Sequence, residues 1–102
     1  MPTNKMRPIR PGEVLAEEFM KPLDLSANQL AQAIGVPANR VSMIIAGTRA
    51  VSADTALRLA RAFQTTPEFW LNLQNAFDLR TAELDASSRK AVAAIRPLSK
   101  AS

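Results

Sequence analysis

Two short helical patterns joined by a glycine constrain this chain more than any other feature of its sequence. The first runs from Ala27 to Ile34 and the second from Pro37 to Ala46, with Gly35 between them and Gly47 after them. Glycine adopts the left-handed backbone conformation that a tight turn between helices requires. Apolar residues recur at the three- and four-residue spacing of one helix face: Leu30, Ile34, Val36, Val41 and Ile44. The sequence therefore predicts two short helices packed closely across a tight turn.

The contact between these helices also needs a small residue where they cross. Ala31 stands at the position where a larger side chain would force the two helices apart. Together with Gly35 and the apolar positions, it completes the pattern of a DNA-binding helix-turn-helix. The alternative interpretation is a helical hairpin that only packs within its domain.

The rest of the chain is helical in pattern as well, and no run alternates apolar and polar residues as a strand does. We predict an all-α fold of five or six helices. The expected segments are about 12–21, Ser26 to about Ile34, about 37–46, one helix from Ser52 and one from Thr66. Ser26 forms a capping box with Gln29, three residues later.

The charged, alanine-rich segment beyond Leu79 allows two interpretations. Asp85, followed by Ser87 and Ser88, restarts a sixth helix, or one long helix continues to Arg96. Pro97 ends the helix in either case.

The apolar face of each predicted helix indicates the core. Aromatic residues around Trp70 recur at helical spacing, which is typical of core packing rather than of an aromatic ligand box. Arg58 and Arg61 are expected at the surface, solvated or ion-paired. The expected inward positions are Leu15 and Phe19; Val41, Ile44 and Ile45; Ala56, Leu57, Ala60 and Phe63; and Phe69, Trp70, Leu73 and Phe77.

A chain of 102 residues is expected to form one domain. We divide it into a flexible N-terminal arm over residues 1–10, a helix-turn-helix domain over 11–80 and a helical tail over 81–102 that is a candidate for dimerisation. The net charge is +4, and no acidic residue lies between Leu25 and Ala53. This distribution favours an approach to phosphates.

Composition excludes most enzymatic chemistry. The chain has no cysteine and no histidine, so we expect no disulfide, no cofactor, no metal site and no catalytic residue. The adjacent carboxylates Glu17 and Glu18 point about 100° apart on a helix and do not converge on one substrate. No apolar run approaches the roughly 20 residues of a membrane span, and the N-terminus lacks a signal-peptide core. We therefore expect a cytoplasmic protein with no membrane partner.

The outer face of the predicted helix 37–46 carries short side chains that suit the reading of base edges in the major groove. It comprises Ala38, Asn39, Arg40, Ser42 and Met43. We expect Asn39 to bond adenine in bidentate fashion and Arg40 to reach guanine or a phosphate. Ser42 suits a base or the DNA backbone, and Ala38 or Met43 suits a thymine methyl group.

Residues that flank this helix are candidates for positioning it on DNA. Thr48 and Arg49 follow it directly and are assigned to phosphate contacts, with a solvated turn as the alternative. Gln29 completes the capping box or reaches the DNA backbone, and the two roles can alternate. Pro37 leaves backbone amides at the helix start that point at a phosphate or are capped by water.

Three stretches of the chain resemble the HigA family of antitoxins, within the wider group of Cro/C1-type (lambda repressor-like, or XRE-like) helix-turn-helix regulators. They read RPGEVLAEEFMKPLDLS, LAQAIGVPANRVSMIIAGTRAVSADTALRLARAF and FWLNLQNAFDL, and they cover roughly residues 8–80. Two positions depart from the family pattern. Asp24 stands where glycine is usual, and Arg10 stands where histidine is frequent before the PGE sequence. Neither is expected to touch the outer face of helix 37–46.

The resemblance implies a homodimer that binds a palindromic operator in double-stranded DNA, represses its own operon and neutralises a partner endoribonuclease toxin of the HigB type. It implies base-reading roles for Ala38, Asn39, Ser42 and Met43, and backbone contacts for Thr48 and Arg49. The helix from Thr66 and the tail are the expected dimer surfaces. The alternatives are a module that mainly sequesters a toxin and a solitary phage-type regulator with no toxin partner.

Overall fold

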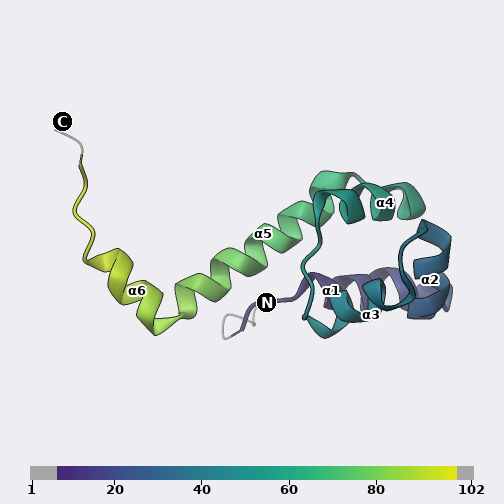
Figure 1. Ribbon diagram of the computed structural model, residues 1–102, viewed down its shortest axis with the longest axis horizontal. Coiled ribbons are helices and arrows are strands. Elements are labelled where there is room, and N and C mark those ends of the chain that lie inside the picture. Colours follow the sequence, from purple (N-terminus) through teal and green to yellow (C-terminus); the bar gives the residue numbers. More distant parts are fainter. Residues whose placement is uncertain (1–6, 99–102) are drawn as a thin grey trace.

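The computed structural model describes residues 7–98, and all regular structure in that range is helical, as predicted (Figure 1). The elements are α1 (Pro11–Val14), η2 (Leu15–Met20), η3 (Lys21–Leu23), α2 (Ala27–Ile34), α3 (Ala38–Ala46), α4 (Ala53–Phe63), α5 (Pro67–Leu84) and α6 (Ala86–Ala93). The first three elements are consecutive and occupy the segment that the sequence predicts as one helix over about 12–21. None of the helices within residues 7–98 is long and apolar enough to cross a bilayer.

The first helical segment changes its hydrogen-bonding pattern along its length. An α-helical turn is followed by the π-helical segment η2 and then by the 3₁₀ turn η3, which contains Pro22. The chain then reverses at Asp24, whose φ of 54° is in the left-handed region. The residue that departs from the family's usual glycine therefore occupies a backbone conformation that favours glycine.

The predicted N-caps form as expected. The Gln29 N–H donates to Ser26 Oγ over 3.0 Å, and the Ser26 N–H donates to Gln29 Oε1 over 2.8 Å, which completes the capping box. Ser52 and Thr66 cap α4 and α5 by accepting from the N–H groups three residues later. These local hydrogen bonds fix the starts of three helices.

The inward face of α4 differs from the prediction at one position. Leu57 was expected in the core, but it is 60% exposed, and Leu59 is 1% exposed in its place. The other predicted positions do face the core: Ala56, Ala60 and Phe63. Thr55, one turn before Leu59, is also buried, and its hydroxyl oxygen accepts from Ser52 Oγ over 3.2 Å. Thr55, whose hydroxyl group is hydrogen-bonded within the capping turn, therefore lies in the core, whereas Leu57 lies at the surface.

Aromatic packing joins the first segment to α4 and α5, as predicted for core residues. Trp70 is fully buried and its indole N–H donates to Thr65 Oγ1 over 2.8 Å. The Phe19 ring lies 4.9 Å from that of Trp70 and 5.2 Å from that of Phe63, centroid to centroid. Such tilted aromatic contacts add to the stabilisation from burial.

The far end of α5 and all of α6 extend away from the helical cluster (Figure 1). Asp85 separates the two helices and accepts from the Ser88 N–H over 2.8 Å, so the tail forms a separate sixth helix rather than one continuous helix to Arg96. Several apolar side chains of this extension are exposed: Leu79, Leu84, Val92, Ile95 and Leu98. A helix with so little core contact leaves an apolar surface without a cover in the monomer.

Candidate nucleic-acid interface

The outer face of α3 is open to solvent within the described part of the chain. Ala38, Asn39 and Ser42 are exposed, and Arg40 and Met43 are half-buried. The opposite face is held in the core by Val41 and Ile44, which are 1% and 2% exposed. The structure therefore brings the five predicted outer residues together on one accessible helix face.

The start of α3 has no side-chain cap. The helix begins at Ala38, one residue later than predicted, with Pro37 as its N-cap, and the Arg40 N–H donates to the Pro37 carbonyl over 2.9 Å. The preceding amides of Ala38 and Asn39 lie in the first turn, where helices leave N–H groups without intrahelical acceptors. The geometry suits an anion without requiring one.

Three of the predicted contact residues already use part of their hydrogen-bonding capacity within the protein. Ser42 Oγ donates to the Asn39 carbonyl over 3.1 Å, and Thr48 Oγ1 donates to the Met43 carbonyl over 3.2 Å, which closes the end of α3. Gln29 uses its carbonyl oxygen in the capping box, so its amide NH₂ stays available to a phosphate. Capping and DNA contact are therefore compatible for Gln29, whereas Thr48 has to rotate its hydroxyl group to donate to DNA.

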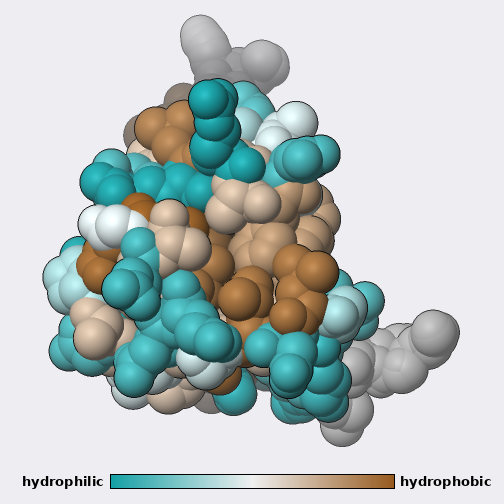
Figure 2. All heavy atoms as spheres, turned by 90° about the vertical axis from the view of Figure 1, so that its right-hand side faces the viewer, coloured by the Kyte–Doolittle hydropathy of each residue, from teal (hydrophilic) through white to brown (hydrophobic). Residues whose placement is uncertain are grey.

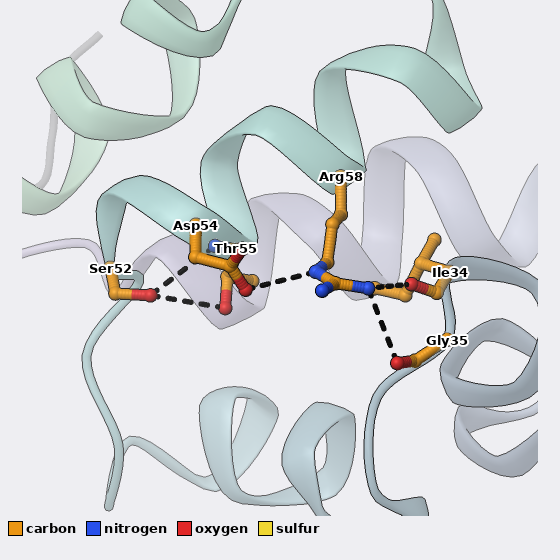
Figure 3. A network of polar contacts seen from close by, with 6 residues as sticks. All are labelled: Ile34, Gly35, Ser52, Asp54, Thr55 and Arg58. Carbon is orange, nitrogen blue, oxygen red and sulfur yellow. Dashed lines mark hydrogen bonds and ion pairs between the residues drawn. The ribbon is translucent and has the colours of Figure 1, made fainter.

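The angle between α2 and α3 is fixed from outside the pair by Arg58 on α4. One guanidinium nitrogen of Arg58 donates to the carbonyls of Ile34 over 2.7 Å and Gly35 over 3.2 Å, at the turn of the helix-turn-helix (Figure 3). Its Nε pairs with Asp54 over 2.9 Å, one helical turn earlier. Arg58 is thus ion-paired, which is one of the two predicted alternatives, and it also caps the carboxyl end of α2. The four-residue spacing predicts the pairing with Asp54, but nothing in the sequence indicates the contacts with Ile34 and Gly35, which lie 24 and 23 positions away.

Gly12 allows the first helix to lie directly on α3. A Cβ at Gly12 would collide with the carbonyl oxygen of Ile44, and with Ile45 Cα at 2.5 Å. Nothing in the local sequence pattern indicates a role for this glycine. Its φ is not in the left-handed region, so its role is close approach of two backbones rather than an unusual turn.

The loop after α3 is tied to α5 by a buried polar side chain. The Val51 N–H donates to Gln74 Oε1 over 2.8 Å, and Gln74 Nε2 donates to Asp78 Oδ1 over 2.9 Å. Gln74 is 8% exposed and was not singled out from the sequence. It fixes the end of the loop that carries Thr48 and Arg49, both of which are exposed.

Residues 7–10, the described part of the predicted arm, contact the domain. Arg7 forms a bidentate ion pair with Glu13 over 2.9 and 3.0 Å, and this pairing lowers the pKa of the Glu13 carboxyl. The Arg10 side chain lies against Gly47 at the end of α3. Residues 1–6 of the arm and 99–102 of the tail lie outside the described residues, and the division into 1–10, 11–80 and 81–102 stays a prediction.

The side of the molecule where α2 and α4 end carries an apolar area bordered by hydrophilic side chains (Figure 2). Between these helices lies a shallow groove of about 330 Å³, lined by Ala33, Ile34, Leu57, Arg58, Arg61 and Ala62. It contains none of the predicted DNA-contact residues. The apolar groove and the outer face of α3 are therefore lined by different residues.

Comparison with known proteins agrees with this geometry. Residues 17–70 match the helix-turn-helix family HTH_3. The antitoxin HigA-1 of Vibrio cholerae is 46% identical over 79 residues, which cover 78% of this chain and 74% of the relative. Other relatives in a similar range of identity are named only as transcriptional regulators.

Solved structures are similar along most of the chain. The antitoxin GraA in complex with its operator has a TM-score of 0.83 and 49% identity, covering 97% of this chain and 99% of that one. The Pseudomonas aeruginosa antitoxin HigA with the higBA promoter has a TM-score of 0.84 and 43% identity, covering 91% and 100%. With the fold, the matched family and these relatives in agreement, the chain belongs to the HigA family of Cro/C1-type helix-turn-helix regulators.

Proposed function

We propose that this protein is the antitoxin of a type II toxin–antitoxin module, acting as a dimer that binds its own operator, represses its operon and neutralises a partner endoribonuclease. The observation that carries the DNA-binding part is the accessible outer face of α3, held rigidly from behind by Val41 and Ile44. The operator-bound structure of its relative GraA supports the same assignment. An operator in the cell's DNA places this activity in the cytoplasm.

In this proposal α3 enters the major groove. Asn39 bonds adenine in bidentate fashion, Arg40 reaches guanine or a phosphate, and Ser42 uses its remaining acceptor capacity on a base or its own hydroxyl on the backbone. Ala38 and Met43 contact thymine methyl groups. Each good bidentate contact discriminates between bases by about 1–3 kcal/mol.

Gln29, Thr48 and Arg49 then position α3 through phosphates. All three are exposed, and they lie at the start of α2 and in the loop after α3. Contacts of this kind set register and affinity without reading sequence, and they make binding sensitive to salt.

We propose that α5 and the tail form the dimer. Leu79 on α5 is 62% exposed, and a groove of about 470 Å³ lies beside it. The groove is lined by Arg7, Pro8, Ile9, Leu73, Ala76, Leu79, Arg80 and Glu83. Two copies related by a two-fold axis would cover this apolar surface and present two α3 helices about 34–36 Å apart, one turn of B-DNA.

The DNA-binding part is tested with the full chain and duplexes from the promoter of its own operon. Asn39→Ala is expected to reduce the preference for the operator over a scrambled duplex, because it removes a base contact. Arg49→Ala is expected to weaken binding to both duplexes alike, and Arg61→Ala, an exposed position on α4, serves as the control. If Asn39→Ala leaves operator binding unaltered, the assignment of α3 as the reading helix is wrong.

The toxin-neutralising part is tested by co-expression with the neighbouring gene of the operon. Stable co-purification, together with rescue of growth from the neighbour's toxicity, is the expected result. A neighbour that is neither toxic nor bound would favour the alternative, a solitary transcriptional regulator, which is how several relatives are named.

A further inference from the structure

The guanidinium of Arg10 is an unusual group near the proposed interface. Its Nε is buried and has no hydrogen-bond acceptor among residues 7–98, and Arg10 takes part in none of the ion pairs of that range. A buried donor without an acceptor costs free energy, so such groups usually have a partner in the functional state.

The position of Arg10 is set by the glycine that ends α3. If Gly47 had a Cβ, that atom would lie 2.7 Å from Arg10 Cδ and 3.1 Å from Nε. Gly47 thus leaves the space in which Arg10 crosses the end of the proposed reading helix. Arg10 also lines a pocket of about 180 Å³ together with Thr48 and Arg49, the two proposed phosphate contacts.

Two carboxylates near Arg10 are engaged elsewhere. Glu13 is held by the bidentate ion pair with Arg7 and accepts from the backbone N–H of Arg10, not from its side chain. Asp78 lines the same pocket, but its Oδ1 accepts from Gln74. Arg10 therefore lies beside the loop after α3 without a direct ion pair of its own among residues 7–98, although its charge acts on Glu13 at longer range.

We propose that Arg10 is a further DNA-contacting residue, which pairs with a backbone phosphate alongside Thr48 and Arg49. A phosphate supplies the counter-charge for the guanidinium, and it meets the terminal nitrogens of Arg10, because the buried Nε lies out of reach of solvent. The contact carries no sequence information, because it is made to the backbone. This assignment rests on the proposed DNA binding and extends the interface to the residue that precedes α1.

The experiment compares salt dependence with stability for Arg10→Ala and Arg10→Lys in the full chain, with Arg61→Ala as the control of equal charge. The slope of log affinity against log salt is expected to fall by about 0.9 for each phosphate that Arg10→Ala releases, and binding at low salt falls accordingly. Arg10→Lys keeps part of the slope because it keeps the charge, and Arg61→Ala leaves the slope unchanged. Without DNA, the unfolding midpoint of Arg10→Ala is expected to stay unchanged or rise, since the variant removes an unsatisfied buried donor.

Two results would overturn the assignment. An unchanged salt slope for Arg10→Ala shows that Arg10 contacts no phosphate. Equal losses of stability in Arg10→Ala and Asp78→Ala, with no change in slope, show instead that the two residues pair within the protein. The slope is measured on operator and scrambled duplexes, because a phosphate contact lowers it on both. An unchanged slope for Arg10→Ala, with the wild-type preference for the operator intact, overturns only the Arg10 assignment. A reduced slope without any preference for the operator overturns only sequence-specific binding. A wild-type chain that binds no duplex overturns both.

Discussion

Arg58 of α4 donates a 2.7 Å hydrogen bond to the carbonyl of Ile34, the last residue of α2. A residue outside the helix-turn-helix thereby caps its first helix at the turn into its second. The arginine is oriented for this contact by Asp54, one turn earlier on α4. The position of the proposed reading helix thus depends on a helix that follows it in sequence.

We therefore expect Arg58→Ala to lower both the free energy of unfolding and operator affinity. The loss of stability is expected to be about 1–2 kcal/mol, since hydrogen bonds from a charged donor contribute more than neutral ones but this side chain is partly solvated. Asp54→Asn removes the charge of the exposed ion pair but keeps an amide oxygen that can accept from Arg58 Nε, so it should cost about 0.5 kcal/mol or less. Urea denaturation measures the free energy of unfolding of both variants. Equal losses in the two would show that the contact of Arg58 with Ile34 contributes little to stability.

Asp24 offers a test of backbone strain. Its φ of 54° is tolerated by aspartate but favours glycine. Relief of that strain is partly offset by the greater chain entropy of glycine in the unfolded state, so Asp24→Gly should raise the free energy of unfolding by about 0.5 kcal/mol. Asp24→Ala should lower it by about 1 kcal/mol. Thermal or chemical denaturation measures the stabilities of the glycine variant, the wild type and the alanine variant, which are expected to decrease in that order. An alanine variant as stable as the glycine variant would contradict the strain argument.

Gly12→Ala tests the close crossing of α1 and α3. The added Cβ meets the carbonyl of Ile44, a backbone group that cannot move without shifting α3. We expect a loss of about 3 kcal/mol, at the upper end for overpacking, and a matching loss of operator affinity. Unchanged stability and affinity, measured by denaturation and duplex titration, would mean that the two helices do not approach this closely.

The ion pair between Arg7 and Glu13 predicts a dependence of stability on pH. The hydrogen bond from Arg7 lowers the pKa of Glu13 from its ordinary value of 4.5. Since the folded-state pKa is below the unfolded one, the stabilisation is present above pH 4.5 and is lost as pH falls through the lowered folded-state value. Glu13→Gln should therefore lower the stability of the folded protein at neutral pH. The variant should then lose less stability than the wild type when the pH is lowered into the acid range.

Unfolding midpoints measured across this pH range check the effect. Glu18→Gln is the matched control, because Glu18 is exposed and takes part in none of the ion pairs of residues 7–98. If both variants follow the same pH profile, the pairing of Glu13 with Arg7 does not contribute to stability.

The sequence by itself determined the features that depend on neighbours within a few positions. Caps at Ser26, Ser52 and Thr66 satisfy backbone groups three residues away, and Gly35 and Gly47 take the left-handed conformation with φ of 72° and 83°. Helical periodicity likewise predicted the core positions of the helix-turn-helix, since the spacing of apolar residues alone defines one helix face.

Only the tertiary structure decided the features that depend on contacts between distant segments. Packing of α4 against its neighbours left Leu57 at the surface and buried Leu59, together with Thr55, in the core. The capping of α2 by Arg58 and the burial of Gln74 join residues more than 20 positions apart. Periodicity carries no information about which side chain faces which across such separations, because that choice is made when the helices pack together.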